Sequence, residues 1–277
     1  MERILILDCN KKVGEQVTIC GFVQTRRDHG KILFLDVSDR SGLIQVVLGG
    51  GKGSELRPQD VVCITGKVNK RPENLINKNI PTGEIELQAE KIEVLSKAEE
   101  LPFDMGNKDL SLQLPTLLDY RSLTLRHPKV KAVFKVQETI AQTFRNVLKD
   151  EGFTEIFVPT IVPTTTEGGA QVFPVEYFEH KAYLAQSPQF YKQIMVGVFE
   201  RVFTIAHAYR AEPSVTTRHL TEYLGLDVEM GFINSWQELM DLAEKVVILI
   251  IRTIEQSHQK ELEQFGAKVP KITKLIP

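Results

Sequence analysis

The sequence is poor in the features that mark secreted, metal-binding and membrane proteins. Its 277 residues hold three cysteines, Cys9, Cys20 and Cys63, whose spacing fits no common metal motif. So small and odd a set predicts reduced thiols. The longest apolar run, residues 246–251, is far too short to span a bilayer, and the N-terminus lacks the pattern of a signal peptide. These absences together predict a cytoplasmic protein without a membrane partner.

The chain also has almost no excess of charge of one sign. The formal net charge of −2 gives no general attraction to nucleic acid, so any RNA contact has to come from a local patch. One candidate patch lies between residues 25 and 78, where ten Lys and Arg face six Asp and Glu. That surplus suits a short track of phosphates, although by itself it carries little weight.

Five short β-rich runs separated by turn residues occupy the first part of the chain. They cover residues 17–23, 32–37, 43–48, 61–68 and 84–87. Strands of this length and spacing predict a small barrel, which we place at residues 1–98. A connector containing proline and glycine follows at residues 99–127, and we expect it to act as a hinge.

The period of the apolar residues changes at Pro128. From there they recur at helical spacing, and a short strand over residues 155–158 follows the helix. Ser235 begins a capping-box pattern ahead of a long amphipathic helix to about residue 263. The predicted fold class is therefore α+β and multidomain, with the barrel followed by an α+β domain at residues 128–277.

Charged side chains gather around one predicted turn in the second half of the chain. They are two arginines, a histidine and four carboxylates: Arg210, Glu212, Arg218, His219, Glu222, Asp227 and Glu229. An arginine that forks onto a phosphate, with a glutamate two residues further along the same strand, suits an adenine nucleotide. On composition alone, a solvated charged hairpin is the more common case. The run resembles motif 2 of class II aminoacyl-tRNA synthetases, most closely the aspartyl branch, with a catalytic domain of archaeal and eukaryotic type.

The resemblance implies an ATP site with contacts from Arg210, Glu212, Arg218, His219, Leu220 and Tyr223. Arg210 would be a catalytic residue that holds the α-phosphate and the attacked carboxylate. The reaction is an in-line displacement at the α-phosphate, which needs positioning and charge neutralisation more than a protein nucleophile. Glu229 is the Mg²⁺ ligand that the resemblance implies.

A second part of the resemblance is the run AQSPQFYKQ. It implies that Gln189 and Lys192 lie over a bound L-aspartate, with Lys192 as a second catalytic residue paired to the β-carboxylate. A positive partner makes chemical sense there, because a buried carboxylate without one is protonated or excluded. Glu167, on a loop with two adjacent glycines, and Asp227 would receive the ammonium group of the amino acid.

Two further segments agree with this family. The helix and strand that lead to Pro159 resemble motif 1, which implies a homodimer with Pro159 in its interface. The barrel resembles the OB-fold anticodon domain of class IIb synthetases, which implies tRNA as a partner. The implied base contacts come from Arg27, Phe34, Gln45, Arg71 and Glu86. Such a surface needs an aromatic platform beside guanidinium and amide groups, whereas periodicity alone makes Phe34 a plain core aromatic.

The chain ends at Pro277 and contains no glycine-rich motif 3, which in this family carries an arginine that completes the ATP site. We therefore expect the chain alone to be inactive. The leading prediction is an aspartate–tRNA ligase activity with ATP and Mg²⁺, with charging of tRNA-Asn besides tRNA-Asp left open. Two alternatives remain, an asparaginyl-tRNA synthetase and a non-catalytic tRNA-binding fragment of a synthetase.

Overall fold

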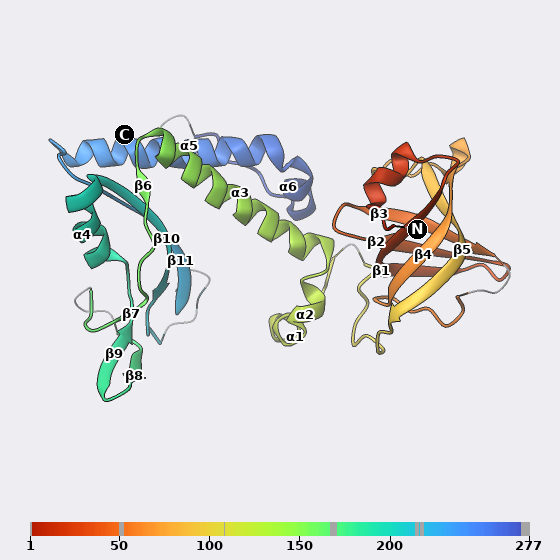
Figure 1. Ribbon diagram of the computed structural model, residues 1–277, viewed down its shortest axis with the longest axis horizontal. Coiled ribbons are helices and arrows are strands. Elements are labelled where there is room, and N and C mark those ends of the chain that lie inside the picture. Colours follow the sequence, from red (N-terminus) through yellow and green to blue (C-terminus); the bar gives the residue numbers. More distant parts are fainter. Residues whose placement is uncertain are drawn as a thin grey trace. The chain divides into compact units, whose positions relative to one another are not determined.

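The computed structural model describes residues 2–49, 53–107, 109–166, 171–213, 216 and 219–272. Contacts between residues divide the chain into two compact units, Met1–His127 and Pro128–Pro277 (Figure 1). Each unit has a hydrophobic core of its own, as is expected of separate domains.

The first unit is built around a closed barrel with the strand order β1-β2-β3-β5-β4. Its strands are β1 (Gln16–Asp28), β2 (Ile32–Ser38), β3 (Leu43–Gly49), β4 (Val61–Lys70) and β5 (Ile85–Ser96), with short 3₁₀ helices at η1 (Ile6–Lys11) and η2 (Glu73–Leu75). Neighbouring strands are antiparallel, except that β3 and β5 pair in parallel. The small barrel predicted from the five β-rich runs is confirmed.

Alternation of side chains along the strands fills the barrel. In β2, Leu33, Leu35 and Val37 point inward and are at most 6% exposed, whereas Phe34 and Asp36 point outward and are half-buried. The same alternation in the neighbouring strands gives an interior of Val, Ile and Leu side chains. Complete burial of one such side chain contributes about 1.5–3 kcal/mol. Phe34 lies outside this core, contrary to what its apolar run alone would favour.

Two short helices follow the barrel, α1 (Leu114–Asp119) and α2 (Arg121–Thr124). Beyond them, the Arg126 guanidinium lies 4.8 Å from the centre of the Phe22 ring on β1 and donates a 3.3 Å hydrogen bond to Gln59. A cation over an aromatic ring contributes about 0.5–1 kcal/mol at an exposed site. The segment predicted as a hinge is thereby attached to the barrel within the first unit.

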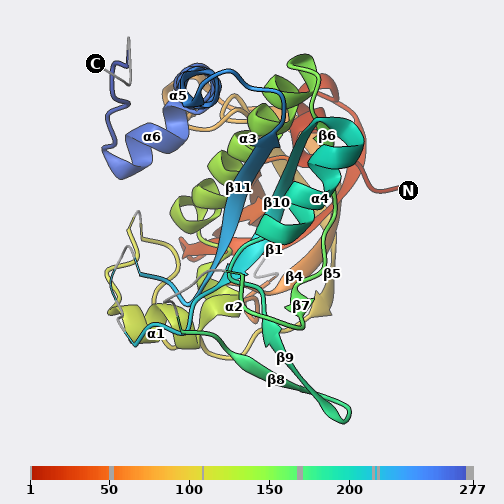
Figure 2. The same cartoon turned by 90° about the vertical axis from the view of Figure 1, so that its left-hand side faces the viewer.

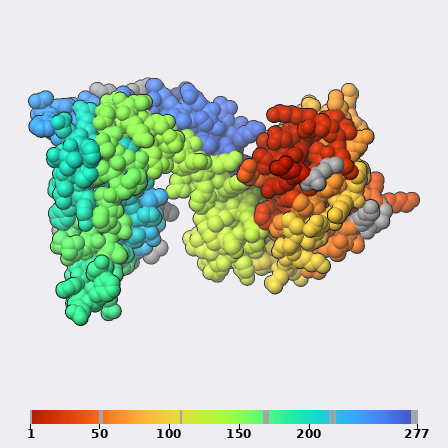
Figure 3. All heavy atoms as spheres, in the orientation of Figure 1, coloured from red at the N-terminus to blue at the C-terminus, as the bar shows by residue number. Residues whose placement is uncertain are grey.

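The second unit combines helices with small sheets. Its helices are α3 (Pro128–Asp150), α4 (Gln189–Phe199), α5 (Trp236–Ser257) and α6 (Gln259–Phe265). One sheet has the order β11-β10-β6, with β11 (Glu222–Met230), β10 (Arg201–Tyr209) and β6 (Thr154–Glu155). The other has the order β7-β9-β8, with β7 (Ile161–Val162), β9 (His180–Leu184) and β8 (Pro174–Tyr177). The β8–β9 hairpin projects away from the rest of this unit (Figure 3).

Helices α3 and α5 pack together against one face of β10 and β11 (Figure 2). Phe144 of α3 meets Phe203 of β10 edge to face, with ring centres 5.6 Å apart. Leu242 and Val246 of α5 complete this core, and Val228 of β11 packs against it. None of the helices among the described residues is long and apolar enough to cross a bilayer.

Two predicted elements differ from the structure. The strand expected over residues 155–158 is short, because only Thr154 and Glu155 pair with β10. The helix expected to reach about residue 263 breaks at His258, between α5 and α6. His258 is buried and its Nε2 atom lies 2.7 Å from Thr139 Oγ1 of α3. Contacts between distant segments therefore decide where both elements end, and the local apolar pattern does not predict these ends.

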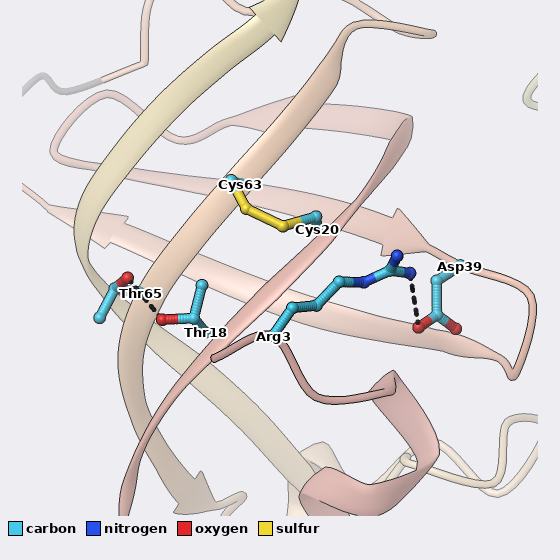
Figure 4. The surroundings of a disulfide bond; sticks show 6 residues. All are labelled: Arg3, Thr18, Cys20, Asp39, Cys63 and Thr65. Carbon is cyan, nitrogen blue, oxygen red and sulfur yellow. Dashed lines mark hydrogen bonds and ion pairs between the residues drawn. A yellow bond between two sulfur atoms is a disulfide. The ribbon is translucent and has the colours of Figure 1, made fainter. Parts of the chain in front are cut away.

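The cysteines also differ from the prediction. Cys20 and Cys63 form a disulfide across β1 and β4, where they are paired in the strand register (Figure 4). The prediction of reduced thiols is therefore wrong for this pair, although Cys9 is free and buried. The two bonded cysteines are 43 residues apart in sequence, so only the antiparallel pairing of their strands reveals that they are neighbours.

Candidate functional site

The strand β11 sorts its side chains onto two faces. Val228 and Met230 pack against the core formed with α3 and α5. Because side chains alternate along a strand, Asp227 and Glu229 point to the opposite face, where they meet α4. Tyr223 has the same parity and lies on that face as well. The face toward α4 is the candidate catalytic face.

Lys192 of α4 is the centre of the catalytic face. Its Nζ lies 2.9 Å from Oδ1 of Asp227 and 3.6 Å from Oε2 of Glu229, and its side chain is only 7% exposed. A buried ammonium group needs carboxylate partners, because loss of hydration is otherwise uncompensated. The two carboxylates come from one strand and the lysine from a helix 35 residues earlier, so the trio exists only in the folded protein.

Arg210 and Tyr223 extend this face at the far end of the strands. Arg210 directly follows β10, and its backbone N–H donates a 2.9 Å hydrogen bond to the carbonyl of Thr221, which continues the ladder. Its guanidinium carbon lies 5.8 Å from the centre of the Tyr223 ring. A guanidinium group and an aromatic ring in contact offer both a phosphate donor and a flat stacking surface.

The start of α4 places one more predicted residue, Gln189. Gln189 begins the helix, and its backbone N–H donates a 3.3 Å hydrogen bond to Ser187 Oγ. Since Lys192 is three residues further on, both side chains lie on the same side of the helix. The loop before the helix is attached to β10, because Tyr209 N–H donates a 3.0 Å hydrogen bond to the carbonyl of Ala185. Gln189 and Lys192 therefore face the sheet from one helix.

The other predicted residues of this site lie in the connections. Glu212 is half-buried and Leu220 is exposed in the segment that joins β10 to β11. His219, also exposed, has its Nδ1 atom 2.7 Å from Thr216 Oγ1. Pro159 is exposed beyond the short strand β6. Glu167 and Arg218 lie outside the described residues.

Sequence reasoning missed two buried polar residues near the catalytic face. Thr204 of β10 is paired with Asp227 in the strand register and is buried. Gln186, within the run that carries Gln189, is buried as well. Because both are buried beside residues of the catalytic face, both are candidates for positioning residues of the site. The run around Gln186 was a signal for that residue, whereas Thr204 becomes visible only through strand pairing.

On the opposite face of the same strands, His207 Nδ1 lies 3.0 Å from a carboxylate oxygen of Glu222. The rings of His207 and Tyr209 are stacked with centres 6.3 Å apart. Desolvation, followed by the nearby Glu222 carboxylate, raises the pKa of Tyr209. These groups are separated from Lys192 by the sheet, so they belong to a different surface.

The donor set of the catalytic face suits one kind of metal site. Within the described ranges, no group of three or more His, Cys, Asp and Glu is arranged to hold a metal ion. Glu229 supplies one carboxylate beside Lys192. Mg²⁺ is usually bound through one or two carboxylates plus substrate phosphates and water. The few carboxylates of this face therefore fit a Mg²⁺ that arrives with a nucleotide, and do not fit a cage made by protein alone.

A second group of predicted residues meets on the outside of the barrel. Arg27 donates two hydrogen bonds to Asp36, of 2.6 and 2.9 Å, and a third of 3.4 Å to Gln45. Gln45 in turn donates a 3.1 Å hydrogen bond to Glu86, whose carboxylate lies 3.9 Å from Arg71. Together with Phe34, these residues make up what we call the barrel face: Arg27, Phe34, Asp36, Gln45, Arg71 and Glu86.

The strand register explains why the barrel face is continuous. Phe34 of β2 is paired with Arg27 of β1, and Asp36 is paired with Gln45 of β3. The outward side chains of the three strands therefore form adjacent rows. The hydrogen bond to Asp36 is the main reason that the pKa of Arg27 is raised. Asp36 was not predicted, although its place two residues after Phe34 puts it on the same side of the strand.

Two known protein families match the sequence of this chain. Residues 113–275 match the family described as tRNA synthetases class II (D, K and N), and residues 17–95 match the OB-fold nucleic acid binding domain. The chain belongs to the class II tRNA synthetases. The match to this synthetase family includes α4, β10 and β11, and hence the whole catalytic face.

Among curated relatives, the aspartate–tRNA(Asp/Asn) ligase of Thermus thermophilus is 44% identical over 276 residues, which is 99% of this chain and 63% of that protein. The aspartate–tRNA(Asp) ligase of Pyrococcus abyssi is 38% identical, over 93% of the chain and 60% of the relative. This synthetase chain thus spans about three-fifths of the length of these relatives.

Solved structures of synthetases are similar as well. The asparaginyl-tRNA synthetase of Pyrococcus horikoshii, complexed with asparaginyl-adenylate, superposes with a TM-score of 0.85 at 31% identity. The match covers 96% of this chain and 61% of that structure. The shared architecture therefore extends over both units of this synthetase chain.

Proposed function

We propose that this synthetase is an aspartate–tRNA ligase. It would activate L-aspartate with ATP to aspartyl-adenylate and then transfer the aspartyl group to tRNA. Two kinds of support combine: the curated relatives at 38–44% identity carry that name, and a buried lysine faces two carboxylates on the catalytic face. The single observation that carries the proposal is Lys192, because it offers a counter-charge to an acidic side chain.

The Lys192–Asp227 pair matches both ends of the proposed substrate. Aspartate has a β-carboxylate and an ammonium group, and the pair offers an ammonium and a carboxylate 2.9 Å apart. On binding, the β-carboxylate would take Lys192 and the substrate ammonium would take Asp227, so that one ion pair is exchanged for two. Glu229 lies 3.6 Å from the Lys192 ammonium in the free chain and would remain on the same face. Asparagine would present a neutral amide to a buried cation, which is a poorer match.

The nucleotide would lie along the same face beside Arg210. In the first step, an α-carboxylate oxygen of aspartate attacks the α-phosphorus, and the bond to the β-phosphate breaks as pyrophosphate leaves. Arg210 would neutralise charge on the α-phosphate, and the Tyr223 ring would stack on the adenine. Glu212 and Leu220 would also contact ATP, with Arg218 and His219 on the outer phosphates. Glu229 would hold Mg²⁺, which supplies charge neutralisation when bound.

The barrel face would bind the anticodon of the tRNA. Phe34 projects from the barrel between charged and amide groups, as a reader of unpaired bases requires. Arg27, Gln45, Arg71 and Glu86 would contact base edges. We further propose Gln189 and Glu167 as aspartate contacts, Pro159 as part of a homodimer interface, and the cytoplasm as the location of the protein.

The test is amino-acid-dependent exchange of pyrophosphate into ATP, run with aspartate and with asparagine. The assay is made on the 277-residue chain and on any longer product of the gene. In the longer product, exchange with aspartate only is the expected result, whereas the 277-residue chain alone is expected to show no exchange. Exchange with asparagine only would support the asparaginyl alternative, which the similarity to the P. horikoshii enzyme favours. No exchange with either amino acid in the longer product, together with binding of a tRNA transcript, would support the non-catalytic alternative.

A further inference from the structure

Cys20 of β1 and Cys63 of β4 lie directly opposite each other on antiparallel strands (Figure 4). Their Cα atoms are 4.1 Å apart and their sulfur atoms are bonded. Both residues are half-buried on the outer side of the barrel. On the same two strands, the hydroxyl groups of Thr18 and Thr65 are 2.9 Å apart. The disulfide therefore lies within the regular register of β1 and β4, which continues at Thr18 and Thr65.

The third cysteine, Cys9, differs from the pair in both bonding and exposure. Cys9 is fully buried in the barrel core. Burial, followed by the carboxylates of Asp39 and Asp8, raises its pKa to about 11. Because the thiolate is the form that reacts, Cys9 stays inert at neutral pH. The chain thus contains one accessible cysteine pair and one protected thiol that serves as an internal control.

The disulfide closes a loop that contains most of the barrel face. The two cysteines are 43 residues apart, and β2 and β3 lie entirely between them. Arg27, Phe34 and Gln45 are inside the loop. The hydrogen bond from Gln45 to Glu86 joins the loop to β5, outside it. Any change in the freedom of this loop is therefore a change in the freedom of the barrel face.

We propose that Cys20 and Cys63 form a reversible redox site that exchanges with low-molecular-weight thiols and disulfides, and that its oxidation state sets the local stability of the barrel face. This inference goes beyond the proposed ligase activity and does not depend on it. Its observations are the register of β1 and β4, the accessibility of the pair and the position of the loop.

A small disulfide, RSSR, is the oxidant in this exchange. One cysteine thiolate attacks RSSR, so that a mixed disulfide forms and RS⁻ leaves. The other cysteine thiolate then attacks the protein-bound sulfur, forms the Cys20–Cys63 bond and releases a second RS⁻. The two cysteine protons pass to the two RS⁻ ions. Overall, RSSR is reduced to two RSH and the protein loses two hydrogen atoms.

The expected consequence follows from chain entropy. Closing a loop removes conformations from the opened and unfolded states, so opening becomes less favourable when the pair is oxidised. With the cysteines 43 residues apart in sequence, we expect reduction to lower the melting temperature of the first unit by roughly 10 °C. The second unit contains no cysteine, and its melting temperature is expected to stay constant.

The experiment equilibrates the full chain in buffers with a series of ratios of reduced to oxidised glutathione. Free thiols are then blocked with an alkylating reagent, and the products are weighed by mass spectrometry. In the native protein we expect two alkylated cysteines under reducing conditions and none under oxidising conditions, with Cys9 alkylated only after denaturation. In parallel, amide hydrogen exchange is expected to be at least tenfold slower in β1 to β4 of the oxidised protein.

Matched variants separate the pair from the buried thiol. Cys9→Ala should keep the whole glutathione response, whereas the double variant Cys20→Ala/Cys63→Ala should lose it. If the double variant folds like the reduced protein, its exchange in β1 to β4 should equal that of the reduced protein and be insensitive to glutathione. Peptides from α3 and α5 should exchange alike in every state.

Two results would overturn the inference. A pair that stays oxidised, or stays reduced, at every glutathione ratio would not be a reversible site. A pair that changes state while hydrogen exchange in β2 and β3 remains constant would be reversible but uncoupled from the barrel face. The wild-type chain alone yields both results, so the inference can fail even where a variant does not fold.

Discussion

The catalytic face and the barrel face use similar charged groups in different surroundings. On the barrel face, the Arg27 side chain is 44% exposed although it forks onto Asp36. On the catalytic face, the Lys192 side chain is 7% exposed between two carboxylates. Water and salt screen the first pair, so it contributes about 0–1 kcal/mol. Removing one partner of a buried pair costs about 3–5 kcal/mol, so burial, and not distance, makes the second arrangement demanding.

This contrast bears on what each surface can recognise. The exposed groups of the barrel face can exchange one partner for another at little cost, which suits contacts to bases that arrive from solvent. The buried Lys192 accepts only a partner of opposite charge without a large penalty. Selection by charge is therefore expected at the catalytic face, and selection by shape and hydrogen bonding at the barrel face.

The largest expected effect is the loss of aspartate activation in Lys192→Met. The change removes the counter-charge of the β-carboxylate, so exchange of pyrophosphate should fall by about a hundredfold to several thousandfold in the active protein. Lys181→Met, which alters an exposed lysine of β9 in the same unit, is the control and should be active. Undiminished exchange in the Lys192 variant would remove this residue from the site.

The next prediction compares the two charge pairs by their effect on folding. Asp227→Asn leaves the buried Lys192 with Glu229 alone, so the free energy of unfolding of the second unit should fall by about 3 kcal/mol. Hydrogen exchange of peptides from β11 and α5 during denaturant unfolding measures this loss in the second unit. Arg27→Ala should lower the stability of the first unit by less than about 1 kcal/mol. Equal losses of stability in the two variants would show that burial does not make the Lys192 pair stronger than the Arg27 pair.

A third prediction sharpens the reading of the barrel face with adjacent residues of β2. Leu35 is fully buried and Phe34 points outward. Leu35→Ala should therefore cost about 2–5 kcal/mol of stability. Phe34→Ala should instead weaken binding of a tRNA transcript by about 1–3 kcal/mol through lost stacking, with a smaller change in melting temperature. Normal tRNA binding by a stable Phe34 variant would show that the ring has no base to stack on.

The smallest effect is expected at Asp39 and depends on pH. Burial alone would raise the pKa of this carboxyl, but hydrogen bonds from the Ser41 hydroxyl and from backbone N–H groups, Ile6 among them, outweigh it and lower the pKa. A carboxyl with a lowered folded pKa stabilises the protein above its unfolded value and ceases to do so as the pH falls through the folded value. Asp39→Asn should therefore flatten the acid limb of the stability curve below about pH 4. Denaturant unfolding between pH 2 and 6 measures the free energy of unfolding at each pH. If the variant and the wild-type chain lose stability equally as the pH falls, the lowered pKa of Asp39 is contradicted.

The elements that the sequence predicted well are those with a strong local period. The five runs of the barrel alternate between apolar and polar residues, and each became a strand of the closed barrel. Helix α3 was evident from its helical spacing. The predictions that failed concern ends and partners, as at His258, where a contact with Thr139 of α3 stops a helix that the local pattern would continue.

For the sites, residue types were predictable and most contacts were not. The resemblance to a family picked out Lys192, Asp227, Arg210 and the outward residues of the barrel. It did not reveal that Lys192 and Asp227 are paired with each other in the free chain. Asp36 and Thr204 were missed, because their importance lies in the residue opposite them on the next strand.

By itself the sequence determined the strands of the barrel, the main helices, the family and the residue types of both faces, since each depends on neighbours along the chain. Only the tertiary structure decided which of these residues meet. Cys20 lies beside Cys63, and Lys192 beside Asp227, because antiparallel register and helix packing bring together segments that are 43 and 35 residues apart. A local pattern specifies the period of side chains along one element, whereas register and burial depend on a second element. The packing of α4 on β11 therefore turned separate charges into an ion trio around a buried lysine.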